Sequence, residues 1–297
     1  MSSERESQPS ASALAVALCR TVASYDPRVE IRGQDYLAEI FLSEEARKTP
    51  QDVATHTAIL KKLAAVSPGG YEFFIARTAY LDAVMQQALR AHIPQVVFLG
   101  AGYDTRTFRF SDLIQDTRIF ELDTPATQQH KRAALEQAQV AIPPQLTFIP
   151  IDFNQDRMVD KLVSAGYATN QKTLFIWEGV SYYLPLTTVD ETLTAIRHNS
   201  QPGSILCFDY MIAASDLAHR FGAVQARASM QAMYTVEPLH FDLEIGQVAA
   251  FLSERGFRVI EHLTTEDMQK RYLTCHDGTL AGQVLDLFGL IQAEVQG

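Results

Sequence analysis

The sequence predicts an α/β protein built on a mainly parallel sheet of about seven strands. Three observations lead to this prediction. From Gln95 onward, short apolar runs alternate with helical patterns, as in a parallel sheet. The ninety or so residues before that point show helical patterns and no strand pattern. The first expected strand ends in Gly100-Ala101-Gly102, and such a turn lets a ligand approach the main chain at the carboxyl edge of a sheet.

The N-terminal part is expected to be helical. Residues 1–10 are polar and expected to be disordered, and helices are predicted over 12–25, 35–41 and 71–91. Thr49-Pro50 has the pattern of an N-cap followed by proline at the first helical position, which opens a further helix to about Val66. Ser67-Pro68-Gly69-Gly70 interrupts the helical pattern. We therefore expect a helical cap over residues 1–94, packed on a core over 95–297.

The core is expected to alternate strands and helices. Strands are predicted over 96–100, 118–123, 146–152, 173–178, 204–210 and 257–262, with a seventh near 271–275. Helices are predicted near 125–139, 156–165, 187–199 and 245–255. Residues from 211 to about 243 lie between the fifth and sixth strands, and this Ala-, Met- and Gln-rich stretch is expected to form a helical lid.

Composition narrows the class of protein. The formal charge of −10 over 297 residues argues against nucleic acid or an anionic membrane as the main partner. The three cysteines are far apart and the eight histidines show no ligand spacing, so neither a disulfide framework nor a metal site is expected. The N-terminus lacks the apolar core of a signal peptide, and no apolar run is long enough to span a membrane. These features predict a cytoplasmic enzyme that acts on a small molecule.

The glycine turn and the second strand together indicate a nucleoside-containing ligand. Thr105 stands where a dinucleotide-binding Gly-x-Gly-x-x-Gly motif has its third glycine, which disfavours a NAD-dependent oxidoreductase. Taken alone, the turn is also compatible with an ordinary strand–turn–helix corner. Glu121 and Asp123 share one face of the second strand, and Asp123 lies nearer its carboxyl end. We expect Asp123 to accept ribose hydroxyls, the alternative being a solvent-facing acid beside a turn.

Acidic and aromatic residues also follow the third and fourth strands. Asp152 is a candidate acceptor for an adenine amino group and Phe153 for packing on the ring, although Asp152 or Asn154 would also suit a helix N-cap. After the fourth strand, Glu178 is expected to enter the cleft, followed by the pair Tyr182 and Tyr183. The tyrosines have plain core packing as their alternative role.

Four segments, in order, resemble the leucine carboxyl methyltransferase family of S-adenosylmethionine-dependent enzymes. They are Ala-Arg77-Thr, Leu-Gly100-Ala-Gly102-Tyr-Asp-Thr-Arg, Glu-Leu-Asp123-Thr-Pro and Trp-Glu178-Gly-Val-Ser-Tyr-Tyr-Leu-Pro. Further on, Val236-Glu237-Pro238 resembles a Gly-Glu-Pro segment of bacterial members, with valine in place of glycine. Arg271-Tyr272-Leu273 resembles their C-terminal region. The resemblance covers roughly residues 70–290 and, more weakly, the N-terminus.

The resemblance implies a Rossmann-like class I methyltransferase fold that binds S-adenosyl-L-methionine and releases S-adenosyl-L-homocysteine. By matching position, Arg77 would hold the carboxylate of the cofactor, an arrangement suited to the fork of a guanidinium. Gly100, Ala101 and Gly102 would hold its methionine part, and Asp123 its ribose. Glu178 would bind the ammonium or line the reaction centre, and aromatic rings suit the neighbourhood of a sulfonium.

The nature of the acceptor determines whether a base is needed. A carboxylate is already ionised at neutral pH, whereas a phenol or alcohol usually needs a general base. His240 is the most plausible base, with Tyr182, Tyr183 and Tyr234 as weaker candidates. The leading hypothesis is methyl-ester formation on a small polyketide-like or secondary-metabolite acid. The alternatives are hydroxyl methylation, methylation of a protein C-terminal carboxylate, and a silent cofactor-binding protein.

Overall fold

The computed structural model describes residues 9–48, 52–153, 155–233, 235 and 237–297. The expectations for residues 1–8, for the Thr49-Pro50 helix start, and for Asn154, Tyr234 and Val236 fall outside these residues. None of the described helices is long and apolar enough to cross a membrane. Within the same residues, no group of three or more His, Cys, Asp or Glu side chains is arranged to hold a metal ion.

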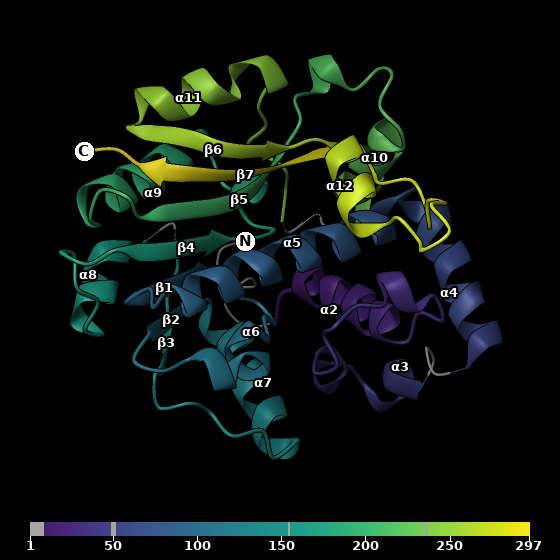
Figure 1. Ribbon diagram of the computed structural model, residues 1–297, viewed down its shortest axis with the longest axis horizontal. Helices are drawn as coiled ribbons and strands as arrows, with labels where there is room; N and C mark the ends of the chain where they lie inside the picture. The colour runs from purple at the N-terminus through teal and green to yellow at the C-terminus, as the bar shows by residue number, and fades with distance from the viewer. Residues whose placement is uncertain (1–8, 49–51, 154, 234, 236) are drawn as a thin grey trace.

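One seven-stranded sheet forms the centre of the molecule (Figure 1), which confirms the predicted fold class. Its strands are β1 (Gln95–Leu99), β2 (Arg118–Asp123), β3 (Leu146–Pro150), β4 (Thr173–Trp177), β5 (Ile205–Met211), β6 (Phe257–Leu263) and β7 (Phe288–Val295). The spatial order is β3-β2-β1-β4-β5-β7-β6, and only β7 runs antiparallel to its neighbours.

The order of the strands creates the point where a ligand is expected. From β1 the sheet grows through β2 to β3 on one side, and the chain then returns to add β4 on the other side of β1. Ligands of open α/β sheets bind at this reversal, beyond the carboxyl ends of the strands. The whole of β1 is buried, as expected for a strand covered on both faces. Gly100, Asp123 and Glu178 therefore meet at one edge, because each ends or directly follows β1, β2 or β4.

Helices cover the sheet. The N-terminal part contains α2 (Ala11–Ser24), α3 (Glu44–Lys48), α4 (Val53–Val66), α5 (Gly70–Arg90) and the 3₁₀ turns η1 (Val29–Ile31) and η2 (Ala38–Phe41). The remaining helices are α6 (Arg106–Arg109), α7 (Pro125–Gln137), α8 (Met158–Ser164), α9 (Leu186–His198), α10 (Ala223–Met233), α11 (Val248–Glu254) and α12 (Thr265–Tyr272). Figure 1 shows α5 lying across the sheet with α2 beside it, and α2 packs on α5. The hydrophobic core includes residues from both sides of position 94, and the division into cap and core stays a prediction.

The predicted seventh strand near 271–275 is wrong. Those residues end α12, whose start at Thr264 carries a capping box with Asp267. The seventh strand is β7, which pairs with β5 and β6 and is therefore covered along both edges. Gly289 hides the strand pattern in the sequence, and the structure explains that residue: a Cβ there would lie 2.3 Å from the Tyr210 ring.

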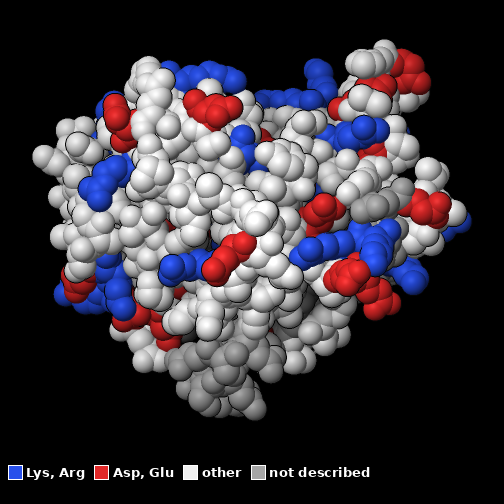
Figure 2. Space-filling view, turned by 90° about the horizontal axis from the view of Figure 1, so that it is seen from below, with Lys and Arg blue, Asp and Glu red and all other residues white. Residues whose placement is uncertain are grey.

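One helical expectation in the N-terminal part also needs correction. Between residues 35 and 41 only the short 3₁₀ turn η2 forms. Helix α4 begins at Val53, and its N-cap is Asp52, whose carboxylate accepts the Thr55 N–H. In the lid region, α10 is joined by the 3₁₀ turns η6 (Ala214–Asp216) and, just beyond the lid, η7 (Ile245–Gln247). The surface in Figure 2 carries both signs of charge, interspersed among uncharged residues.

Candidate active site

The glycine turn directly follows β1 at the carboxyl edge of the sheet. Gly100 and Gly102 have φ angles of +71° and +49°, which glycine adopts without steric strain. The N–H groups of Gly100 and Ala101 both donate to the Leu122 carbonyl at 2.9 Å, so the turn is tied to the end of β2. A Cβ on Gly100 would lie 2.5 Å from Val180 Cγ2. Position 100 therefore needs glycine for its backbone angle and for its close packing.

Asp123 ends β2 and lies beside this turn. Its Oδ2 accepts the Gly102 N–H at 2.6 Å and its Oδ1 accepts the Thr124 N–H at 2.7 Å. Burial raises the pKa of this carboxyl, and the two N–H donors oppose that shift. The structure thus brings Asp123 and the glycine turn together, and it leaves Asp123 Oδ2 with a further lone pair.

Arg77 of α5 lies between two carboxylates at the ends of neighbouring strands. Its Nη1 donates to Asp209 Oδ2 at 2.6 Å, and its Nε lies 3.0 Å from Glu178 Oε1. The second contact brings opposite charges together without an aligned hydrogen bond, so the buried Nε–H has no hydrogen-bond acceptor among the described residues. Asp209 Oδ1 also accepts the Gly179 N–H at 2.7 Å. Asp209 therefore fixes both Arg77 and the turn after β4.

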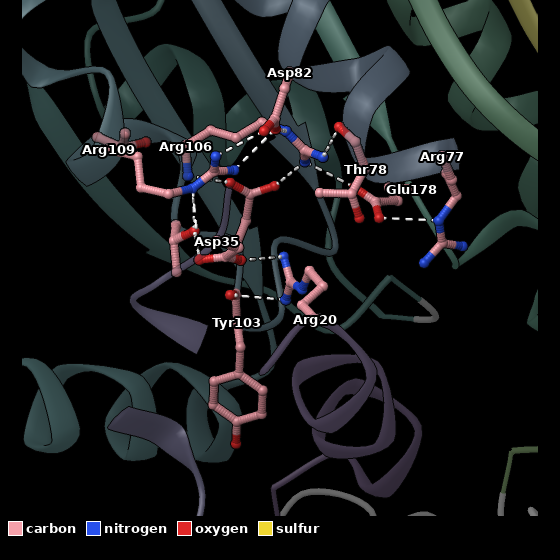
Figure 3. A network of polar contacts seen from close by, with 12 residues as sticks. Arg20, Asp35, Arg77, Thr78, Asp82, Tyr103, Arg106, Arg109 and Glu178 are labelled. Atoms are coloured by element: carbon pink, nitrogen blue, oxygen red, sulfur yellow. Dashed lines mark hydrogen bonds and ion pairs between the residues drawn. The ribbon is translucent and has the colours of Figure 1, made fainter. Parts of the chain in front are cut away.

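A continuous chain of ion pairs, which we call the arginine–acid network, runs from the cap to Glu178 after β4 and to Asp209 in β5. Figure 3 shows the part of this network from Arg20 to Arg77. All of its side chains are 12% exposed or less. Its members are Arg20, Asp35, Arg109, Asp82, Arg106, Asp104, Glu178, Arg77 and Asp209.

Arg106 is the centre of the network. Its Nε lies 2.7 Å from Asp82 Oδ1 and its Nη1 2.7 Å from Glu178 Oε2, and it also contacts Asp104. The backbone N–H of Arg106 donates to Asp104 Oδ1 at 2.7 Å. Arg106 therefore joins α5, the glycine turn and the end of β4 through one fully buried guanidinium.

The cap side of the network passes through Asp35. Arg109 Nη1 lies 2.6 Å from Asp82 Oδ2, and Arg109 Nε lies 3.5 Å from Asp35 Oδ1. Arg20 of α2 lies 3.4 Å from Asp35 Oδ2 and donates a hydrogen bond to the Tyr103 carbonyl. Helix α2 is thus held against the residues that follow the glycine turn.

The network sets the charge of Glu178. Burial alone disfavours its charged form, but the guanidiniums of Arg106, Arg77 and Arg20 outweigh burial and lower the pKa to about 2. For Asp209 burial dominates, and the pKa is raised despite the contact with Arg77. Glu178 is therefore a carboxylate at any pH at which an enzyme works.

The predicted adenine contacts lie after β3. Asp152 and Phe153 are both half-buried, and the Asp152 carbonyl accepts the N–H groups of Gln155 and Asp156 in a tight turn. Helix α8 begins at Met158, with Arg157 at its N-cap, so the alternative that Asp152 caps a helix is wrong. Their contact with adenine stays a prediction.

The predicted catalytic residues occupy different environments. Tyr182 is 4% exposed, and its ring packs against Tyr183 at 4.7 Å and Phe288 at 5.1 Å between centroids. Its carbonyl accepts the His240 N–H at 2.8 Å, which places the end of the lid against the turn η5 (Ser181–Tyr183). The His240 side chain is exposed, and Tyr183 is half-buried.

A series of hydrogen bonds connects Asp123 to the lid through Ser10, the residue before α2. Thr124 Oγ1 contacts Asp123 Oδ1 at 3.3 Å and Thr127 Oγ1 at 3.0 Å. Thr127 Oγ1 accepts the Ser10 N–H at 3.2 Å, and Ser10 Oγ donates to Glu237 Oε1 at 2.9 Å. The start of α2 and the Glu237 segment therefore close over the end of β2.

Two cavities lie beside the cap. One of about 600 Å³ has a mainly apolar lining from α2, η2 and α7, and one of about 240 Å³ lies between α2, α5 and residues 30–35. The smaller cavity is lined by Arg20, Asp35 and Thr78, each with a buried polar atom that lacks a hydrogen-bond partner within the described chain. A polar cavity of this volume accommodates several water molecules. Neither cavity is lined by the glycine turn or Asp123.

Sequence reasoning missed most of the network. Asp209 is the next-to-last residue of a predicted strand that neighbours the one delivering Glu178, so a search for acids near the carboxyl ends of strands would have found it. Asp104 and Arg106 belong to the glycine-turn segment itself, yet nothing local indicates that Arg106 turns back toward Asp82 and Glu178. Arg20 and Asp35 join the site only because α2 folds over α5.

The sheet order and the glycine turn with its acidic neighbour define the class I methyltransferase fold, and comparison with known proteins assigns the family. The leucine carboxyl methyltransferase family model matches residues 13–197. The chain belongs to this family, which confirms the resemblance of the four sequence segments.

Among the relatives, a Bacillus subtilis protein is 32% identical over 67% of this chain and 66% of its own length. A Streptomyces coelicolor protein is 30% identical over 76% of this chain and 77% of its own length. Both relatives carry a provisional name as S-adenosyl-L-methionine-dependent methyltransferases. A Streptomyces avermitilis relative is 33% identical over 56% of its length, so the chain spans between 56% and 77% of the length of these three relatives.

Solved structures share the fold. A provisionally named methyltransferase of Thermobifida fusca superimposes with a TM-score of 0.61, at 15% identity, over 98% of this chain and 96% of that one. An O-methyltransferase family protein of Burkholderia thailandensis gives 0.51 at 13% identity, over 88% and 67% of the two chains.

Proposed function

We propose that this chain transfers the methyl group of S-adenosyl-L-methionine to a carboxylate of a small polyketide-like or secondary-metabolite acid, forming a methyl ester. The family supports the cofactor. The choice of acceptor rests on the residues around the end of β4.

The residues at the sheet edge fit this cofactor. Gly100 has a positive φ at the carboxyl edge of the sheet, and without a side chain there the main chain can lie close to a ligand. Asp123 Oδ2 has a lone pair for a ribose hydroxyl. Glu178, fixed as a carboxylate, suits the ammonium of the methionine part, and the guanidinium of Arg77 suits its carboxylate. When bound, the cofactor supplies an electrophilic methyl group on a sulfonium.

The state of Tyr182 is the observation that carries the proposal of a carboxylate acceptor. Burial raises the pKa of its hydroxyl well above the ordinary value, so it is protonated at neutral pH and is a poor base. Glu178 and Asp209 are held by Arg77, and the His240 side chain is exposed rather than set in the cleft. A carboxylate acceptor needs no proton removed, and this arrangement suits that chemistry.

Calorimetry tests the cofactor part of the proposal. S-adenosyl-L-methionine should bind, and Asp123→Ala should weaken binding by about 1–3 kcal/mol because the ribose hydroxyls lose their acceptor. Gln115→Ala, on the exposed loop before β2, is a matched control that should bind normally. Binding of NADH in place of S-adenosyl-L-methionine would exclude the proposed activity.

Single-turnover methyl transfer against pH tests the acceptor. With a carboxylic acid acceptor, the rate should be nearly constant from about pH 6 to 9, and His240→Ala should leave it unchanged. A rising limb that disappears in His240→Ala would make the chain a hydroxyl methyltransferase. Methylation of a C-terminal peptide carboxylate, but of no small acid, would show that the acceptor is a protein.

A further inference from the structure

The arginine–acid network contains one more acid than it has arginines. Three arginines pair off with three acids along the chain of contacts: Arg20 with Asp35, Arg109 with Asp82, and Arg106 with Asp104. The remaining cation, Arg77, faces both Glu178 and Asp209. The excess negative charge of the described network therefore lies at the ends of β4 and β5.

Asp209 is the acid that creates this excess. It is 0% exposed, and within the described residues its carboxylate contacts Arg77 and accepts the neutral N–H of Gly179. Asp209 shares Arg77 with Glu178. A buried negative charge that is only partly compensated is unfavourable, so the site gains stability from a cation placed nearby. Coulomb attraction across a buried site falls off slowly with distance, and direct contact is not needed for this effect.

The cofactor and its product differ by one positive charge. S-adenosyl-L-methionine carries a sulfonium, an ammonium and a carboxylate, for a net charge of +1. S-adenosyl-L-homocysteine has lost the sulfonium charge with the methyl group and is neutral overall. An acidic site at this position therefore distinguishes the two ligands by charge, although their shapes are nearly the same.

We propose that Asp209 is a specificity-determining residue whose charge makes the site prefer the sulfonium cofactor over its neutral product. It acts through the field at the Arg77–Glu178 end of the network and not through contact with the reacting atoms. The proposal rests on the cofactor position of the proposed function. Its consequence is that methyl transfer itself loosens the spent cofactor.

Separate calorimetric titrations with S-adenosyl-L-methionine and S-adenosyl-L-homocysteine test this role. In Asp209→Asn, the affinity for S-adenosyl-L-methionine should fall about five- to tenfold. The affinity for S-adenosyl-L-homocysteine should change less than about twofold, so the ratio of the two affinities falls. Asp209→Glu keeps the charge and should keep the wild-type ratio, even if both affinities decrease.

Asp26→Asn is the matched control, because Asp26 is also 0% exposed and paired with an arginine, but belongs to the loop after α2. In Asp26→Asn, the ratio of the affinities for the two ligands should equal that of the wild type. The proposal is wrong if Asp209→Asn lowers the affinities for both ligands by the same factor. It is also wrong if Asp209→Glu lowers the ratio of the two affinities as much as Asp209→Asn does. In either case Asp209 has only a structural role. If Asp123→Ala leaves both ligands unaffected, the proposed cofactor position fails instead.

A measurement on the wild type covers the case in which Asp209→Asn does not fold. Sinefungin carries an amine in place of the sulfonium and is cationic at neutral pH. The wild type should bind it more tightly than S-adenosyl-L-homocysteine, and this preference should diminish as the amine loses its proton at alkaline pH. Equal binding of the two at pH 7 would overturn the inferred excess of negative charge.

Discussion

Replacing Arg106 by methionine should destabilise the protein more than the corresponding change at Arg109, although both side chains are buried and both are ion-paired. Without Arg106, Asp82 keeps Arg109 and Glu178 keeps Arg77. Within the described residues, Asp104 keeps no cation. Leaving one buried carboxylate uncompensated costs about 3–5 kcal/mol.

Arg109→Met leaves no acid alone, because Asp82 retains Arg106, and Asp35 retains Arg20 and the Thr105 hydroxyl. Its cost is limited to lost hydrogen bonds, about 1–3 kcal/mol. Urea unfolding followed by circular dichroism measures both values. We expect the Arg106 variant to be less stable by roughly 2 kcal/mol.

A second substitution tests whether the uncompensated charge of Asp104 causes the loss of stability in Arg106→Met. Asp104→Asn removes the uncompensated charge, and its amide oxygen can still accept the backbone N–H at position 106. Adding it to Arg106→Met should therefore recover about 2 kcal/mol. Equal stability of the two single variants, or no recovery in the double variant, would refute the reasoning that Asp104 depends on Arg106 alone.

Three further outcomes follow from the site. Arg77→Lys should weaken S-adenosyl-L-methionine binding by about 1–3 kcal/mol in calorimetry, because a single ammonium cannot replace the planar fork; an unchanged affinity would remove Arg77 from the site. Gly100→Ala should lower the urea midpoint more than Gly278→Ala, since both have positive φ but only the Cβ at 100 meets Val180; equal midpoints would show that the contact relaxes freely. The pKa of Glu178 is lowered from 4.5 to about 2, so its contribution of about 3 kcal/mol is present above pH 4.5 and lost as the pH falls toward 2. Acid unfolding of Glu178→Gln should lack that loss, and an identical acid profile would contradict the lowered pKa.

Local sequence determined the parts of this protein that depend on near neighbours. The apolar run before Gly100 is a buried strand, because its residues need cover on both faces of a parallel sheet. The glycines at 100 and 102 mark the turn, because few other residues accept their backbone angles. Asp123 ends a strand whose extent is set by its own run of residues. The carboxyl edge of the sheet and its glycine turn were therefore predictable from the sequence.

Only the tertiary structure decided how charges meet across that edge. Arg106 lies 72 residues before Glu178, and Arg77 lies 132 residues before Asp209. No periodicity links such pairs, because their contact depends on how α5, α6 and the strands pack together. The same holds for β7, whose Gly289 is explained by the ring of Tyr210 on the neighbouring strand. A buried charge requires a partner of opposite charge, but the local sequence does not show which residue that partner is. The packing of the fold decides it.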